Sequence, residues 1–317
     1  MNCHCCQSEE VKKSGRFTNK NFTVQRYQCN RCGKTFSDKQ PLDGLRVDFK
    51  QACQAVHLLC ESMGIRAIQR ITGLHQETIL NILETAGQKA AQHLDAKIRN
   101  VTADRIAADE IHSFVYSKQR NTDGRHINRG DQFTFFSIDP RSKLIVNWFV
   151  GKRTAENAND FLTDLKSRMA GQFQLTTDNW QIYSGQDGQV RKVFGEGVDY
   201  ATETKYFAKP APFLPRRLTS ISRRCRIGNP DMSLATTAHA ERTNLSARLF
   251  TRRFTRCTLG YSKKLENLKH AVALFVWHFN FCRTHSAHGF TPAFAGGVAP
   301  KEPMTIAQLL GRDLTDC

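Results

Sequence analysis

The stretch Gln132-Phe-Thr-Phe-Phe-Ser-Ile138 decides the fold, together with the turn Asp139-Pro-Arg-Ser142 and the stretch Lys143-Leu-Ile-Val-Asn-Trp-Phe-Val150. Both stretches are rich in aromatic and β-branched residues, which favour strands, and Asp-Pro is typical of a turn. The three segments therefore predict a β-hairpin. Residues 105–116, which precede it, predict another strand.

A helix and further strands are expected after the hairpin. Thr154 is a typical N-cap, and the apolar spacing that follows predicts a helix to about Met169. Residues 174–177 predict a short strand, residues 190–194 another strand, and the Pro- and Arg-rich residues 209–230 a loop or insertion. With a long helix over residues 264–281, this order predicts an α/β domain that resembles the ribonuclease H fold.

Three acidic residues stand out in this layout. Asp109 ends the run Arg105-Ile-Ala-Ala, Asp178 ends Phe173-Gln-Leu-Thr-Thr, and Glu241 lies in a segment that predicts a helix. Two strand aspartates and one helix glutamate could hold two Mg²⁺ ions about 4 Å apart, an arrangement that suits attack on a phosphodiester. The sequence leaves alternatives open: Glu110 or Asp104 for Asp109, and a simple turn for Asp178. The rivals of Glu241 are Glu196, Asp199, Glu203 and Asp231.

Cysteine spacing marks the first segment of the chain. Cys3-x-x-Cys6 is followed after 22 residues by Cys29-x-x-Cys32. Two such pairs can present four thiolates to one structural Zn²⁺ ion. With short strands expected around Gly15–Phe17 and residues 22–27, the spacing predicts a zinc ribbon, in which Cys5 is a bystander.

A helix, a short turn at Gly73 and a second helix follow the ribbon. The pattern is that of a helix-turn-helix, although an ordinary helical hairpin has the same periodicity. If the second helix enters the major groove, the polar side chains near its start would meet the bases. The residues expected to do so are Gln76, Thr78 and Asn81.

The charge of the chain points to a polyanionic partner. The 317 residues carry a net charge of +17, and residues 205–256 hold twelve Lys or Arg against the two acids Asp231 and Glu241. Such a concentration of charge fits a groove that follows a phosphate backbone better than an acidic membrane surface. The start of the chain has no apolar signal segment and no run is long enough to span a bilayer, so we expect no membrane contact and a cytoplasmic protein.

These motifs together resemble one family of enzymes. The paired Cys-x-x-Cys knuckles, the helix-turn-helix, Asp109-Glu110, Thr177-Asp178-Asn-Trp180 and His239-Ala-Glu241-Arg-Thr-Asn244-Leu are similar to those of the transposases of the insertion sequence one family. The resemblance extends from Cys3 to about Pro292. It implies a DDE enzyme with a ribonuclease H fold, in which Asp109, Asp178 and Glu241 hold the metal and His239 assists.

The resemblance also implies partners and DNA contacts. The partners are double-stranded DNA, both inverted-repeat ends and target DNA, and further copies of the chain, in a bacterial or archaeal cell. Asn244 and Arg242 are expected to orient Glu241 or to contact DNA. The remaining DNA contacts are expected from Arg248, Arg252, Arg253 and Arg256.

The sequence therefore predicts a DNA transposase in four parts. Residues 1–43 form the zinc ribbon, 44–98 the helix-turn-helix domain, 99–298 the catalytic domain and 299–317 a peripheral tail. The expected activity is Mg²⁺-dependent strand cleavage and strand transfer. The alternatives are a DNA-binding regulator with a non-catalytic domain, a structure-specific nuclease, and a recombinase with a serine or tyrosine nucleophile.

Overall fold

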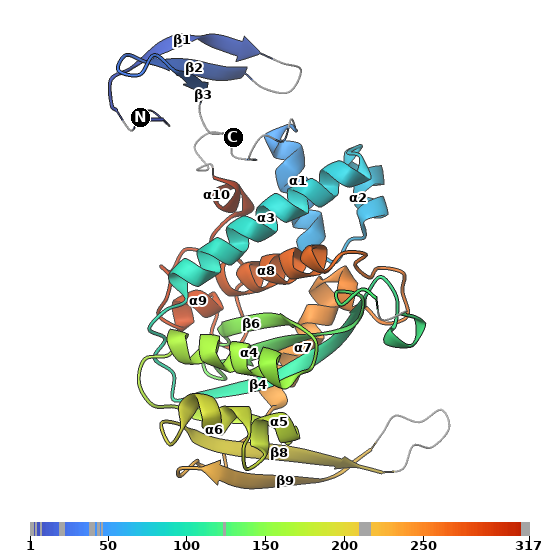
Figure 1. Cartoon of the computed structure of the whole chain (residues 1–317). Helices are drawn as coiled ribbons and strands as arrows, with labels where there is room; N and C mark the ends of the chain where they lie inside the picture. Colours follow the sequence, from blue (N-terminus) through green and yellow to red (C-terminus); the bar gives the residue numbers. More distant parts are fainter. Residues whose placement is uncertain are drawn as a thin grey trace.

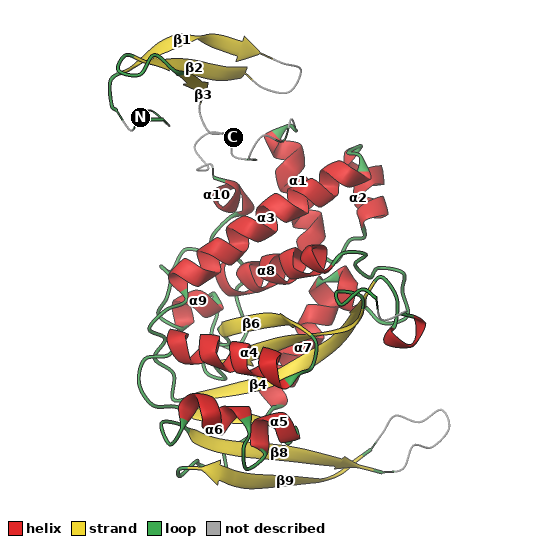
Figure 2. Cartoon of the chain, viewed as in Figure 1, coloured by secondary structure: helices red, strands yellow, loops and turns green. Residues whose placement is uncertain are grey.

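A six-stranded mixed sheet occupies the lower half of the molecule in Figures 1 and 2, with helices packed on it and β8 and β9 at its lower edge. The computed structural model describes Cys3, residues 5–6, 8–18 and 23–37, Leu42, Leu45, and residues 47–122, 125–208 and 217–311. The strand order is β6-β5-β4-β7-β8-β9. The strands are β4 (Arg105–Val115), β5 (Gly130–Ile138), β6 (Ile145–Gly151), β7 (Gln174–Asp178), β8 (Asp199–Phe207) and β9 (Leu218–Ile227).

The pairing within this sheet changes direction at β4. Strands β4, β5 and β6 form an antiparallel meander, whereas β7 runs parallel to β4, β8 runs parallel to β7, and β9 returns antiparallel. The expected hairpin, the strand before it and the strand at β7 are confirmed. This mixed sheet flanked by helices resembles the ribonuclease H-like fold that the sequence implies.

Helices cover both faces of the sheet because its strands alternate apolar side chains between them. Phe135 packs on Phe161 of α4 on one face, and its neighbour Phe136 packs on Phe275 of α8 on the other. The helices are α1 (Phe49–Cys60), α2 (Ile65–Thr72), α3 (Gln76–Lys97), α4 (Ala155–Arg168), α5 (Gln181–Ser184), α6 (Gln189–Phe194), α7 (Ala238–Phe250), α8 (Leu265–Phe281), α9 (Pro292–Ala295) and α10 (Ile306–Leu310), with 3₁₀ turns η1 (Gln119–Asn121) and η2 (Arg252–Phe254).

The long helix α3 lies directly against α8, and one glycine permits the contact. A Cβ added to Gly87 would lie 2.5 Å from the Cβ of His270, a separation that carbon atoms do not reach. The buried residues of α1 and α3 belong to the same hydrophobic core as those of the sheet. Helix α3 is therefore part of the body that supports the sheet.

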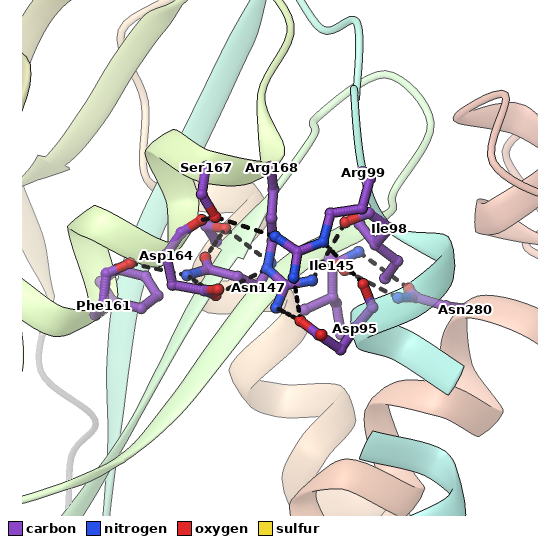
Figure 3. A network of polar contacts seen from close by, with 11 residues as sticks. Asp95, Ile98, Arg99, Ile145, Asn147, Phe161, Asp164, Ser167, Arg168 and Asn280 are labelled. Carbon is purple, nitrogen blue, oxygen red and sulfur yellow. Dashed lines mark hydrogen bonds and ion pairs between the residues drawn. The ribbon is translucent and has the colours of Figure 1, made fainter. Parts of the chain in front are cut away.

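A polar network fixes the end of α3 to the sheet layer (Figure 3). The guanidinium of Arg168 in α4 donates to Asp164, to Asp95 of α3 and to the carbonyl of Ile98. Nearby, the amide side chain of Asn280 in α8 bonds both the N–H and the C=O of Ile145. Because β6 is an edge strand, this amide pairs backbone groups that another strand would otherwise take.

A separate three-stranded antiparallel sheet carries the cysteines. Its strands are β1 (Val11–Thr18), β2 (Thr23–Cys29) and β3 (Thr35–Ser37), in that order. Most of their side chains are exposed, while Cys3 and Cys29 are buried. A sheet with so little apolar interior is typical of a fold that depends on a metal.

Three expectations from the sequence are wrong. Residues 190–194 lie in helix α6, because Val190 and Phe194 point inward at helical spacing. The expected insertion at 209–230 contains the whole of β9, whose partly polar residues hid the strand, and residues 209–216 lie outside the described residues. The tail is not wholly peripheral, since Ile306 and Leu310 of α10 are buried in the common core.

None of the helices in the described ranges is both long enough and apolar enough to cross a membrane.

Candidate active site and metal centres

The four cysteines predicted as ligands are brought together between the ribbon strands. The Sγ atoms of Cys3 and Cys32 are 3.6 Å apart, as are those of Cys6 and Cys29, and all four lie within 4.8 Å of one another. Four sulfurs at about 2.3 Å from a tetrahedral Zn²⁺ would be about 3.8 Å apart. The cluster therefore fits a zinc ion without rearrangement, and Cys5 is exposed beside it.

The three predicted carboxylates come from separate elements on one face of the large sheet. Asp109 lies in the middle of β4, Asp178 is the last residue of β7, and Glu241 lies in the first turn of α7. Burial raises the pKa of Asp109 to about 6, and the negative charges of Asp178 and Glu241 add to the increase. The three groups therefore share one electrostatic environment. Among the described residues, however, only the cysteines have all their ligand atoms within 4.8 Å.

The geometry separates Asp109 from its sequence alternatives. Asn244 of α7 donates to Asp109 Oδ2 at 2.8 Å, which places Asp109 on the face that α7 covers. Glu110 is the next residue of the strand and points to the opposite face. Burial raises its pKa to about 7, and the charge of Asp178 at the end of β7 adds to the increase. Asp104 is largely exposed and is paired with Arg141.

Two basic side chains contact the carboxylates. Arg153, just before α4, is 3.1 Å from Glu110 Oε2 and 3.2 Å from Asp178 Oδ2, and its guanidinium lies over the ring of Trp180. Lys205 of β8 is paired with Glu241. These cations partly neutralise a group of acids that would otherwise repel one another.

Helix α7 begins where it does because a buried carboxylate holds its first turn. Glu203 of β8, the register partner of Asp178, accepts hydrogen bonds from the backbone N–H and hydroxyl of Thr237 at 3.0 and 2.9 Å. Burial alone would raise the pKa of Glu203, but these bonds and the charge of Lys205 outweigh it and lower the pKa. The Thr237 hydroxyl is also 3.1 Å from Glu241 Oε1, so Glu203 positions the residue that leads to Glu241.

The other rivals of Glu241 are occupied elsewhere. Glu196 is exposed and paired with Arg191, and Asp199 accepts from the backbone of Asn229. Asp231 accepts from the N–H and the hydroxyl of Ser233. Glu203 is thus the rival that lies beside the three carboxylates.

The other residues predicted near Glu241 differ in their contacts and in their burial. His239 Nδ1 is 3.3 Å from Lys143 Nζ, and burial followed by the charge of Lys143 lowers its pKa. Asn244 is buried and bonds Asp109, so it orients that aspartate and does not lie on the surface. Of the predicted DNA-contacting arginines, Arg242 and Arg256 are exposed, whereas Arg248, Arg252 and Arg253 are half-buried.

The predicted recognition residues lie at the start of α3. Gly73 takes a left-handed conformation (φ 73°) at the end of α2, and α3 begins three residues later. Asn81 is exposed and Thr78 half-buried, while Gln76 donates to Gln69 of α2 at 2.9 Å. The structure therefore has a helix, turn and helix here, with one of the three polar side chains engaged between the helices.

Sequence reasoning missed the role of Arg153, Lys205 and Glu203. Arg153 lies in the short loop between β6 and α4, and only the signal of a basic residue at a strand end could have marked it. Lys205 and Glu203 lie in β8, a strand that the sequence did not predict. Because side chains two residues apart share a face of a strand, their common position can be recognised only once β8 is known.

Comparisons with known proteins give no close relative. No protein-family model matches the chain, and no curated protein matches it. One similar solved chain belongs to the simian T-cell lymphotropic virus intasome in complex with PP2A regulatory subunit B56 gamma, at 16% identity, with 80% of this chain and 77% of that chain covered and a TM-score of 0.38. Another belongs to the Mos1 strand transfer complex, at 10% identity, 72% and 76% coverage and a TM-score of 0.27. Because both TM-scores are below 0.5, neither similarity supports the fold assignment. The assignment is based on the strand order of the sheet and on the helices packed against it.

Proposed function

We propose that this protein is a DNA transposase of the DDE type, similar to those of the insertion sequence one family. The observation that supports the proposal is that Asp109 of β4, Asp178 of β7 and Glu241 of α7 lie near one another: Asn244 of α7 bonds Asp109, and the charges of Asp178 and Glu241 help to raise the pKa of Asp109. Neither β4 nor β7 alone supplies enough carboxylates for a metal site. A site for divalent metal needs several oxygen ligands close together, and the three segments together could supply them.

The carboxylates are proposed to hold two Mg²⁺ ions, which when bound would activate the attacking oxygen and stabilise the leaving oxygen. Asp109 has the central position, Asp178 and Glu241 flank it, and Asn244 fixes the orientation of Asp109. For these carboxylates to bind metal, the ion pairs Arg153–Asp178 and Lys205–Glu241 must open. Once the pairs open, the positive charges of Arg153 and Lys205 are available to the phosphates of the DNA.

The ribbon and helices α2 and α3 are proposed to bind the ends of the element. The ribbon would use one Zn²⁺ on Cys3, Cys6, Cys29 and Cys32 as a structural ion. The start of α3, with Asn81 exposed, would meet the major groove. Because an element has two ends, we propose that at least two copies of the chain act together on DNA.

The test uses the DNA that flanks the gene. Purified protein and Mg²⁺ are incubated with this DNA beside the variant Asp109→Ala, and new 3′ ends are mapped by sequencing. Breaks at the edge of an inverted repeat, absent with the variant, are the expected result. A full set of breaks with the variant would contradict the metal assignment.

One observation favours a second candidate, a DNA-binding regulator without catalysis. Arg153 and Lys205 already neutralise Asp178 and Glu241, as cations do in a purely structural acidic cluster. A protein that binds the repeats but makes no breaks with Mg²⁺ or Mn²⁺ would establish this alternative.

A further inference from the structure

The hairpin of β8 and β9 extends beyond the other strands of the sheet and presents two different faces (Figure 1). On one face lie Glu203 and Lys205, which contact the first turn of α7. Alternation along β8 places Phe207 on this same face. The register shifts between Tyr206 and Phe207, where β9 has the extra residue Thr219, so that Phe207 is opposite Leu218. The cross-strand pairs on it are Glu203–Arg223, Lys205–Ile221 and Phe207–Leu218.

This face changes character with distance from the carboxylates. The buried carboxylate of Glu203, in register with Asp178, is paired with the more exposed Arg223, and Lys205 is paired with Glu241. Farther out, the apolar side chains are exposed to solvent: Phe207 by 50%, Leu218 by 44% and Ile221 by 43%. Three large apolar side chains that gather beside a polar site indicate a binding surface.

The opposite face of the same hairpin lacks this pattern. Its pairs Thr202–Arg224, Thr204–Ser222 and Tyr206–Ser220 are polar apart from the tyrosine ring. Tyr206 is 48% exposed, almost the same as its neighbour Phe207. The two aromatic residues therefore form a matched pair that differs in the face on which each lies.

The charge of the hairpin identifies the class of partner. Strand β9 contains no acidic residue. Arg223, on the same face as Phe207, and Arg217, just before the strand, are exposed. A second copy of this chain, whose net charge is also +17, offers this surface no complementary charge. A polyanion with apolar faces matches both the basic and the apolar side chains, and nucleic acid is such a polymer.

Base faces are accessible to Phe207 only where bases are unpaired, because in a duplex they stack on one another. Along the strand, Phe207 is about 6.6 Å from Lys205, and Lys205 is paired with Glu241. A DNA strand with its phosphate at Glu241 would therefore have its neighbouring nucleotides near Phe207.

We propose that the face formed by Phe207, Leu218 and Ile221 binds unpaired nucleotides directly beside the phosphate to be cut. The proposal rests on the proposed function, since it assigns that phosphate to the carboxylates. Phe207 stacks on a base, Leu218 and Ile221 pack against its edge, and Lys205 contacts the flanking backbone. The hairpin would then favour DNA whose end is already opened.

The test is binding of the full-length protein in buffer without added Mg²⁺, so that no strand is cut. The probes are a fluorescein-labelled duplex that is fully paired and the same duplex with mismatched bases at one end. We expect the wild type to prefer the opened duplex by about fivefold or more, because stacking on an aromatic ring is sequence-tolerant and substantial. Phe207→Ala should remove that preference, whereas Tyr206→Ala should retain it.

Several results would overturn the proposal. One is equal affinity of the wild type for both probes, and another is an equal effect of Phe207→Ala and Tyr206→Ala. A change of oligomeric state in Phe207→Ala with an unchanged preference would assign the face to a second copy instead. Unaltered melting temperatures of both variants exclude misfolding as the cause. Since no cleavage is needed, failure of Mg²⁺-dependent cutting overturns the proposed function alone.

Discussion

The cysteine cluster and the carboxylate group are two candidate metal sites built in opposite ways. The four thiols come from two local knuckles and already stand at the separations that Zn²⁺ requires. The three carboxylates come from β4, β7 and α7, and Arg153 and Lys205 hold two of them in ion pairs. The first site is a property of a short segment. The second depends on the packing of the whole domain, and its ion pairs would have to open if the carboxylates are to bind metal.

The largest expected effect concerns the local site. Cys29→Ser should lose zinc and with it terminal-repeat binding, because metal binding of about 10–16 kcal/mol is what folds such a module. Zinc content is measured by elemental mass spectrometry and DNA binding by fluorescence anisotropy. The matched control is Cys5→Ser, which should keep one zinc because Cys5 is exposed beside the cluster. A full zinc content in Cys29→Ser would count against the ribbon.

The next effect concerns the assembled site. Asp178→Asn should reduce cleavage by about a thousandfold or more, because a lost metal ligand costs several kcal/mol of transition-state stabilisation. End binding should be unchanged, since the ribbon and α3 do not depend on this side chain. Glu196→Gln is the control, because Glu196 is exposed and paired with Arg191. Equal cutting by Asp178→Asn and the wild type would remove Asp178 from the metal site.

The difference between the two sites explains what could be predicted. The four cysteines were found because their ligand spacing is short and fixed by the chain itself. Asp109 and Asp178 were predicted as ligands because each ends an apolar run, and alternation could not choose between Asp109 and Glu110. The bond from Asn244 shows that Asp109 lies on the face that α7 covers. Strands β4, β5, β6 and β7 were predicted for the same reason, because apolar runs are typical of buried strands.

The elements that escaped prediction depend on distant partners. Strand β9 has mostly exposed side chains, and β8 joins the sheet through its parallel pairing with β7, a contact without a local signal. Helix α6 was mistaken for a strand because a short apolar run fits either structure. The roles of Arg153, Lys205 and Glu203 follow only from side chains that meet across elements.

A substitution at the contact between α3 and α8 should affect the carboxylate site but not the cysteine cluster. Gly87→Ala forces a methyl group against His270, where the backbone must shift, and we expect a loss of about 1–3 kcal/mol in the free energy of unfolding. Because α8 also packs on Phe136 next to Asp109, cleavage should fall while zinc content stays complete. Chemical denaturation measures the stability. Gly64→Ala is the control, since a Cβ there meets nothing within 4 Å and its φ is −75°.

The smallest effect tests whether the carboxylate site must rearrange. If Arg153 competes with metal for Asp178, Arg153→Gln should bind Mn²⁺ about fivefold more tightly, since a half-exposed ion pair is worth roughly 1 kcal/mol. Calorimetric titration measures the affinity, and Arg141→Gln, which removes an exposed pair with Asp104, should leave it unchanged. Tighter metal binding need not give faster cutting, because Arg153 also lies where a DNA phosphate would approach. Weaker Mn²⁺ binding in Arg153→Gln would instead show that the guanidinium preorganises Asp178, and the carboxylate site would then be as fully formed as the cysteine cluster.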